Sequence, residues 1–175
     1  MQLPRILTLA LGLTMIWGGA SEKASSQTLD IDSFMGDWFE VASTKPIFQR
    51  NCFCSRTTYE LVDDKIMLVN SCNVGSVDGK IREVSGTARP TFFLNTFSVD
   101  IDPFSRFLRI PNYSIVEYDT NYEWAVVSTF IKRPIWILSR APELDSEVME
   151  TIIQDLQNRG YPVTAIKKTD QTGCP

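Results

Sequence analysis

The chain has 175 residues, of which 43% are hydrophobic and 22% are charged, and its formal net charge is −4. These values are typical of one soluble globular domain with a sizeable core. The acidic balance argues against nucleic acid or an anionic membrane surface as the main partner. Histidine is absent, which excludes Ser-His-Asp and Cys-His catalysis, histidine metal ligands and a proximal-histidine haem. We expect no cofactor and no metal site.

Residues 1–26 have the pattern of a signal peptide. Arg5 supplies a positive charge before an apolar run, Ile6 to Trp17, which is too short to span a bilayer. Small residues follow, and cleavage after Ala20 or after Ser26 fits the pattern equally well.

The mature domain is then expected at 27–175, as a soluble protein of the periplasm, the thylakoid lumen or the extracellular space. No cysteine lies near the cleavage region, so we expect no stable membrane anchor. The chain has four cysteines. In an exported chain these predict two disulfides, the alternative being four reduced thiols.

Short runs of β-branched and aromatic residues recur through the mature domain, separated by turn residues. After a helical turn near 31–35, we expect strands at about 37–44, 52–62, 66–70, 80–88, 92–101, 112–118, 124–130 and 135–139. Asp102-Pro103 is expected to break the fifth strand, and Asp63-Asp64 is interpreted as a solvated hairpin tip rather than a metal or catalytic site. This many short strands predicts a barrel or a sandwich.

The last of these strands is apolar at every position, which indicates burial on both faces. The next segment can cover its outer face, because it has the apolar spacing of an amphipathic helix. Asp145 or Ser146 would cap that helix, and Gly160 would end it.

Three motifs stand in a fixed order along the chain. Gly36-Asp37-Trp38 opens the first strand, Asp119 and Tyr122 precede the seventh, and the run Trp136 to Arg140 closes the eighth. Together they resemble the motifs of the lipocalin family. The resemblance implies an all-β fold, an eight-stranded antiparallel up-and-down barrel with one C-terminal α-helix packed outside. It also implies a cup at one end and, at the other, Trp38 beneath the guanidinium of Arg140.

The resemblance covers residues 30–175 and joins features of bacterial lipocalins, apolipoprotein D and plant plastid lumenal lipocalins. The ending from Thr169 to Pro175 is similar to that of apolipoprotein D. That similarity implies a Cys54–Cys174 disulfide, which leaves Cys52 with Cys72. The exchanged pairing is the alternative. The segment 45–50 corresponds to a loop that lies over the cup mouth in lipocalins.

The resemblance places Trp136 in the wall of the cup, as a ligand-binding residue. Phe97 and Tyr113 are further candidates by strand position, although packing in the core explains either equally well. Asp119 and Tyr122 could be drawn as acid and base, but we interpret them as a turn that caps the closed end of the barrel.

We therefore expect an exported, non-enzymatic carrier of a small hydrophobic ligand, such as a fatty acid, a lysolipid or an oxidised lipid. It would be a monomer or weak homodimer and could protect membranes under oxidative stress. The alternative is a lipocalin-type isomerase or de-epoxidase, which needs a free cysteine or a carboxylate in the cup. The sequence does not place Glu40 or Glu117 there. Protease inhibition and siderophore capture lack support, because the clustered cations lie in turns and near the tail.

Overall fold

The computed structural model describes residues 28–63, 65–101 and 110–174. Its strands are β1 (Gly36–Ser43), β2 (Cys52–Val62), β3 (Lys65–Val74), β4 (Lys80–Pro90), β5 (Thr96–Asp100), β6 (Tyr113–Tyr118), β7 (Trp124–Ser128), β8 (Trp136–Ser139) and β9 (Lys167–Lys168). Its helices are α1 (Ile31–Phe34), η1 (Ile47–Gln49), α2 (Ser146–Asn158) and η3 (Val163–Ala165). The expected signal peptide, Asp64 and the strand break at Asp102-Pro103 lie outside the described residues.

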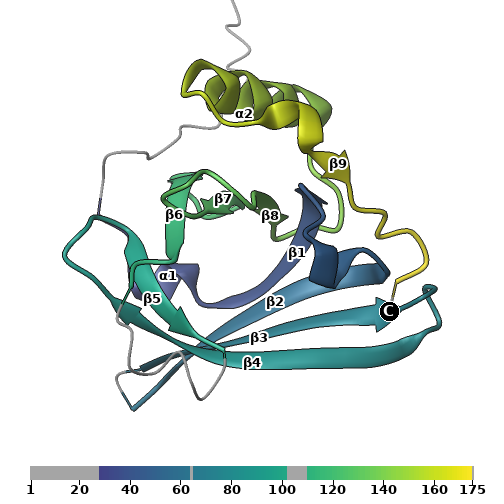
Figure 1. The fold of residues 1–175 in the computed structure, drawn as a ribbon, viewed down its shortest axis with the longest axis horizontal. Coiled ribbons are helices and arrows are strands. Elements are labelled where there is room, and N and C mark those ends of the chain that lie inside the picture. Colours follow the sequence, from purple (N-terminus) through teal and green to yellow (C-terminus); the bar gives the residue numbers. More distant parts are fainter. Residues whose placement is uncertain (1–27, 64, 102–109, 175) are drawn as a thin grey trace, which may run out of the picture.

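Strands β1 to β8 form a closed antiparallel barrel. Each strand pairs with the next, and β1 pairs with both β8 and β2, so the ring has no free edge. Figure 1 shows the ring with α2 outside it and the short β9 beside β1. The predicted barrel and its outer helix are confirmed. β9 was not predicted.

Three of the predicted strand boundaries are wrong. β3 continues through Cys72 to Val74, beyond the predicted end at 70. β5 begins at Thr96 because Asn95 adopts a positive φ of 51° and closes a turn before it. β7 ends at Ser128, and the apolar residues Phe130 and Ile131 lie exposed in a turn instead of extending the strand.

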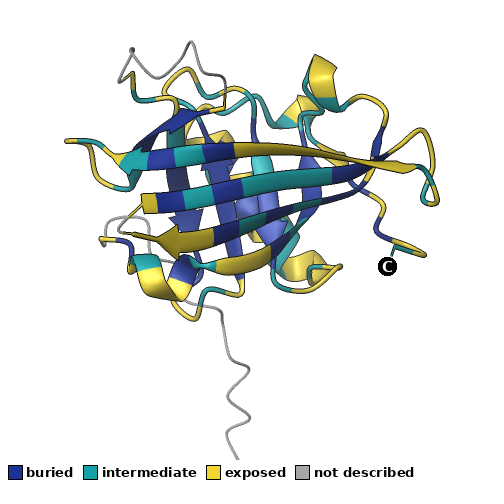
Figure 2. Ribbon diagram, turned by 90° about the horizontal axis from the view of Figure 1, so that it is seen from below, coloured by how far each residue is buried: buried dark blue, intermediate teal, exposed yellow. Residues whose placement is uncertain are grey.

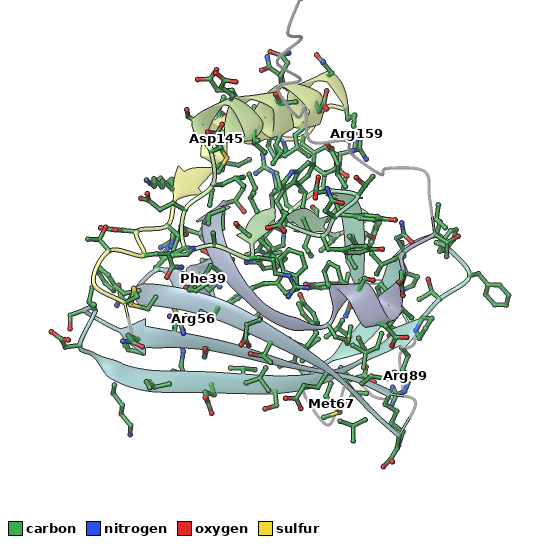
Figure 3. All side chains as sticks on the ribbon, turned by 180° about the vertical axis from the view of Figure 1, so that it is seen from behind. Phe39, Arg56, Met67, Arg89, Asp145 and Arg159 are labelled. Carbon is green, nitrogen blue, oxygen red and sulfur yellow. A yellow bond between two sulfur atoms is a disulfide. The ribbon has the colours of Figure 1, made fainter. Side chains whose placement is uncertain are left out.

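Helix α2 covers the outer face of one side of the barrel. Ile152 and Leu156 are fully buried against Val41, Val126 and Ile137, which explains why β8 is apolar on both faces. The helix begins where Asp145 Oδ1 accepts hydrogen bonds from the backbone N–H groups of the first turn, at 2.8 and 3.3 Å. Its last residues lie over β6, where Arg159 pairs with Glu117 at 3.2 Å (Figure 3).

The opposite side of the barrel, from β2 to β4, is more open to solvent. The first six residues of β4 are exposed (Figure 2). Between β2 and β1, the guanidinium of Arg56 lies 4.7 Å from the ring centre of Phe39 (Figure 3). Within the described residues, no helix has the length and apolarity needed to cross a membrane.

Candidate ligand-binding cup

The closed end of the barrel is built around Trp38. Its ring is fully buried and its Nε1 donates to the carbonyl of Phe34 in α1 at 2.9 Å. Arg140 donates hydrogen bonds to the carbonyls of Asp37 and Met35, both at 2.8 Å, and so joins α1 to the end of β8. Gly36 has a φ of +96°, and an added Cβ would lie 3.3 Å from Arg140 Nη1. This end of the barrel is therefore a packed floor.

Asp119 and Tyr122 form a turn at the same end. Asp119 is buried, and its Oδ2 accepts from the N–H groups of Asn121 and Glu123 at 2.9 and 3.3 Å. Tyr122 has a positive φ of 60°, and its hydroxyl accepts from the N–H of Asp30 at 2.9 Å. These contacts tie the β6–β7 turn to the N-terminal arm, and neither side chain lines the cup.

Above the floor, the inner faces of the strands enclose a cavity of about 420 Å³. Strand alternation directs every second side chain inward. The apolar lining consists of Phe48, Leu68, Val84, Val99, Ile101, Trp136 and Leu138. The volume lies within the range of about 300–1,000 Å³ that small-molecule pockets occupy.

The three predicted ligand residues lie at different depths. Trp136 and Tyr113 line the cavity. Phe97 is buried beneath it, in the cluster that contains Trp38, and borders a separate space of only about 10 Å³. The structure thus brings Trp136 and Tyr113 together in the cup and places Phe97 in the packed floor.

A pair of tyrosine hydroxyls separates the two spaces. Tyr59 and Tyr113 are hydrogen-bonded to each other through their hydroxyl oxygens. Burial raises the pKa of both phenols well above the usual value, and the neighbouring Tyr113 raises that of Tyr59 further. Two hydroxyls carry two hydrogens and share one bond, so one O–H remains to donate. Tyr113 is the member that also borders the cup.

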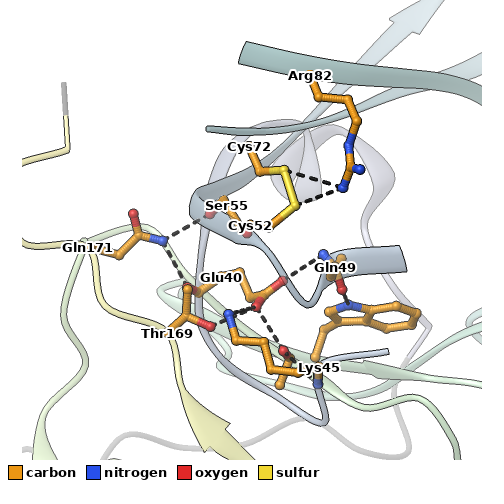
Figure 4. Close-up of polar contacts among 11 residues, drawn as sticks. Glu40, Lys45, Gln49, Cys52, Ser55, Cys72, Arg82, Thr169 and Gln171 are labelled. Carbon is orange, nitrogen blue, oxygen red and sulfur yellow. Dashed lines mark hydrogen bonds and ion pairs between the residues drawn. A yellow bond between two sulfur atoms is a disulfide. The ribbon is translucent and has the colours of Figure 1, made fainter. Parts of the chain in front are cut away.

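Glu40 is the carboxylate of the cup wall, and sequence reasoning did not place it there. It lies two residues after Trp38, so alternation puts both on the inner face of β1. Its Oε1 accepts from Ser43 Oγ at 2.8 Å and Thr169 Oγ1 at 2.7 Å, and lies 3.4 Å from Lys45 Nζ (Figure 4). Glu117 instead faces outward beneath α2, where Arg159 pairs with it.

Gln49 links that carboxylate to Trp136. Its Nε2 donates to Glu40 Oε2 at 3.0 Å, and its Oε1 accepts from the indole Nε1 of Trp136 at 2.8 Å (Figure 4). Because Gln49 belongs to η1, this chain of contacts fixes the β1–β2 loop to the wall of the cup. The loop expected over the mouth is therefore anchored at one side.

Two disulfides complete the site. Cys52 pairs with Cys72 across β2 and β3, and Cys54 pairs with Cys174 in the tail, as the resemblance implied. Arg82 lies beside the first bridge in the cup lining, with Nη2 3.0 Å from Cys52 Sγ and donating to the Phe48 carbonyl at 2.7 Å. The bridge and Arg82 therefore brace the rim of the cup.

The chain thus forms an eight-stranded closed up-and-down barrel with a packed floor, an apolar cup and a helix outside. A family model described as a lipocalin-like domain matches residues 29–171. The chain therefore belongs to the lipocalin family.

Relatives occur in viruses, plants and animals. A lipocalin of Acanthamoeba polyphaga mimivirus is 31% identical over 79% of this chain and 83% of its own length. Temperature-induced lipocalin-1 of Arabidopsis thaliana is 26% identical over 84% of this chain and 82% of its own length. Mouse apolipoprotein D is 23% identical over 97% of this chain and 92% of its own length. Among solved structures, lobster apocrustacyanin A1 is similar in fold, with a TM-score of 0.64 and 20% identity over 83% of this chain and 82% of its own.

Proposed function

We propose that this protein binds a small hydrophobic molecule with one long apolar segment, a fatty acid, a lysolipid or an oxidised lipid, and carries it in the cup. The observation that carries the proposal is the cavity of about 420 Å³ with a mainly apolar wall that includes Trp136. Lipocalins as a family bind small hydrophobic ligands. Burying about fourteen methylenes gains roughly 11 kcal/mol, at ~0.8 kcal/mol each. Association and ordering offset about 4–15 kcal/mol. The methylenes alone therefore leave at most about 7 kcal/mol, a Kd of roughly 10 μM, and contacts to the polar head must supply any tighter binding.

The polar groups of the cup suggest how the ligand lies. The exposed guanidinium of Arg82 at the rim suits an anionic or phosphate-bearing head, and no described carboxylate pairs with it. The Tyr113 hydroxyl lies at the floor and can donate to an oxygen on the distal part of a chain. An apolar segment would then run along Trp136 between these two groups.

The predicted signal peptide and the two disulfides support an exported carrier. In an oxidising compartment both bridges persist, so the rim and the tail keep their positions. We further propose that the carrier removes oxidised lipids from membranes under stress. The Tyr113 hydroxyl supports this role, because it would favour a lipid chain that carries oxygen.

The alternative function is a lipocalin-type enzyme, and the position of Glu40 is the observation that supports it. It is a buried carboxylate in the cavity wall, as an acid or base would need to be. Its oxygens are, however, already held by Ser43, Gln49, Thr169 and Lys45. All four cysteines are in disulfides, so an isomerase that uses a lone thiol lacks its nucleophile. The geometry favours binding.

A fluorescence titration tests the proposal. A fatty acid carrying a quencher along its chain should quench Trp136 saturably, and unlabelled lysolipid should reverse the quenching. The Trp136→Phe variant should lose most of that quenching, since the other tryptophans of the mature domain, Trp38 and Trp124, are buried outside the cup. Equal quenching in both proteins would contradict the proposed site.

A further inference from the structure

The open end of the barrel carries large apolar side chains that face solvent. They are Ile47 and Phe48 in η1, exposed by 77% and 64%, and Phe130 and Ile131 in the β7–β8 turn, exposed by 74% and 64%. We call these four residues the mouth patch. A soluble protein seldom exposes aromatic and aliphatic side chains at the tips of adjacent loops unless they contact a partner.

The two loops of the mouth patch are held together. The Thr44 N–H donates to the Ile135 carbonyl at 3.0 Å, and the Ile135 N–H donates to Thr44 Oγ1 at 3.1 Å. Gln49 fixes η1 to the cup wall, and the side chain of Lys132 donates to the carbonyl of Arg159 at 2.6 Å. The patch is therefore presented by anchored loops. Ile47, Phe130 and Ile131 do not line the cup, whereas Phe48 also borders its mouth.

Charge around the mouth patch is positive although the chain is acidic overall. In the described loops and strand starts of the open end, the exposed charged residues are Arg50, Asp78, Lys80, Arg82, Glu83 and Arg133, which are four cations and two carboxylates. At the closed end, the exposed carboxylates include Asp30, Asp32, Asp37, Asp63 and Glu123, and the exposed cation Lys65 lies at the start of β3. Although the net charge of the chain is −4, its exposed charge is thus mainly positive at the open end and mainly negative at the closed end.

We propose that the mouth patch docks on the surface of an anionic lipid bilayer, with the cup opening against the membrane. Apolar side chains that enter the headgroup region and cations that lie beside them are the two elements of interfacial membrane binding. The acidic closed end would be repelled and would point away from the surface. The proposal differs from the expectation from overall charge, because the distribution of charge decides which face meets the membrane. The proposal holds whether or not a lipid occupies the cup.

The closed end provides a matched control. Phe92 and Phe93, in the β4–β5 turn, are exposed by 107% and 66%, so they are as apolar and accessible as the mouth patch. They lie on the acidic end, near the arm held by the hydrogen bond from Leu29 N to Asn95 Oδ1. A general stickiness of exposed aromatics would involve both ends, whereas docking by the proposed face involves only one.

Vesicle flotation of the mature, oxidised protein tests this proposal. Vesicles of phosphatidylcholine alone are compared with vesicles in which one quarter of the lipid is phosphatidylglycerol. We expect binding to the anionic vesicles, weakened by added salt. The variant I47S/F130S/I131S, which leaves the cup-lining Phe48 in place, should lose binding. Arg50→Glu with Arg133→Glu should weaken binding by roughly tenfold or more. The variant F92S/F93S should bind as the unmodified protein does.

Three results would overturn the proposal: no binding to anionic vesicles, equal loss in the F92S/F93S control, or unchanged binding by the mouth-patch variant. Sedimentation tests a further outcome. If the unmodified protein is a dimer and the mouth-patch variant is a monomer, the patch is assigned to contact with a second copy of the chain. Thermal unfolding checks that each variant is folded. Binding of lysolipid in solution without vesicles reports on the cup separately, so failure of docking and failure of ligand binding can be told apart.

Discussion

The guanidinium of Arg140 lies 3.8 Å from the ring centre of Trp38, so the last barrel strand closes over the first (Figure 1). The same side chain donates to backbone carbonyls of α1 and of the segment after it. Burial lowers the pKa of the guanidinium, but the group remains charged at any physiological pH. One residue thus seals the floor of the barrel.

Replacement of Arg140 by lysine should destabilise the barrel although it keeps the charge. Lysine cannot reproduce a planar fork that bonds several carbonyls at once, so we expect the free energy of unfolding to fall by about 2 kcal/mol. Urea unfolding measures the change. Lys168→Met removes only an exposed pair with Glu143 and should cost less than about 0.5 kcal/mol. Similar losses in both variants would contradict the assigned role.

Gln49→Met should loosen the β1–β2 loop without emptying the cup. The substitution removes the hydrogen bonds to Trp136 and Glu40 at similar side-chain length. Each such bond contributes about 1 kcal/mol, so ligand dissociation should quicken by at least about fivefold. Stopped-flow displacement of a fluorescent fatty acid measures the rate. Gln154→Met, which breaks an exposed bond to Asn158 on α2, should leave the rate unchanged.

Tyr113→Phe should change ligand preference more than ligand affinity in general. The variant lacks the hydroxyl that can donate into the cup, so a fatty acid with a terminal hydroxyl should bind about five- to tenfold more weakly, the equivalent of one hydrogen bond. The plain fatty acid of equal length should bind as well as before. Competition titrations measure both. An equal loss for the two ligands would show that Tyr113 acts only through packing.

The Tyr59–Tyr113 pair predicts a stability loss at high pH. Burial raises the pKa of both phenols in the folded protein above the unfolded value of about 10. The folded state therefore keeps protons that the unfolded state has released. The contribution is fully present below about pH 10 and is lost as the pH rises above that value. The double variant Y59F/Y113F should show a flatter decline in unfolding midpoint above pH 10, and an unchanged decline would contradict the prediction.

Sequence alone was sufficient for the barrel and its floor. The motifs around Trp38, Asp119 and Arg140 mark three points of the closed end, and their residues lie together in the structure as expected. Alternation along each strand predicts which side chains face inward. The prediction for Trp136 came from the family resemblance. Alternation could have placed Glu40, two residues after Trp38, on the same inner face as Trp38.

The alternation of side chains along a strand does not predict how deep in the barrel a residue lies. Phe97 faces inward, but the turn closed by Asn95 starts β5 late and leaves Phe97 beside the floor. Nor does an apolar run distinguish a strand from an exposed loop tip, so Phe130 was assigned to β7. The position of such residues depends on pairing with distant strands, and a local pattern does not contain that information.

The most direct test of the account is native mass spectrometry of the mature, oxidised protein incubated with lysolipid, compared with the variant Val84→Trp. Val84 faces the cup but is 39% exposed, so a tryptophan there fills the cavity without entering the packed core. We predict one bound lysolipid on the unmodified protein and none on the variant, with both proteins equally stable. An unmodified protein that remains empty, or a variant that binds equally well, would contradict the assignment of the cup as the ligand site.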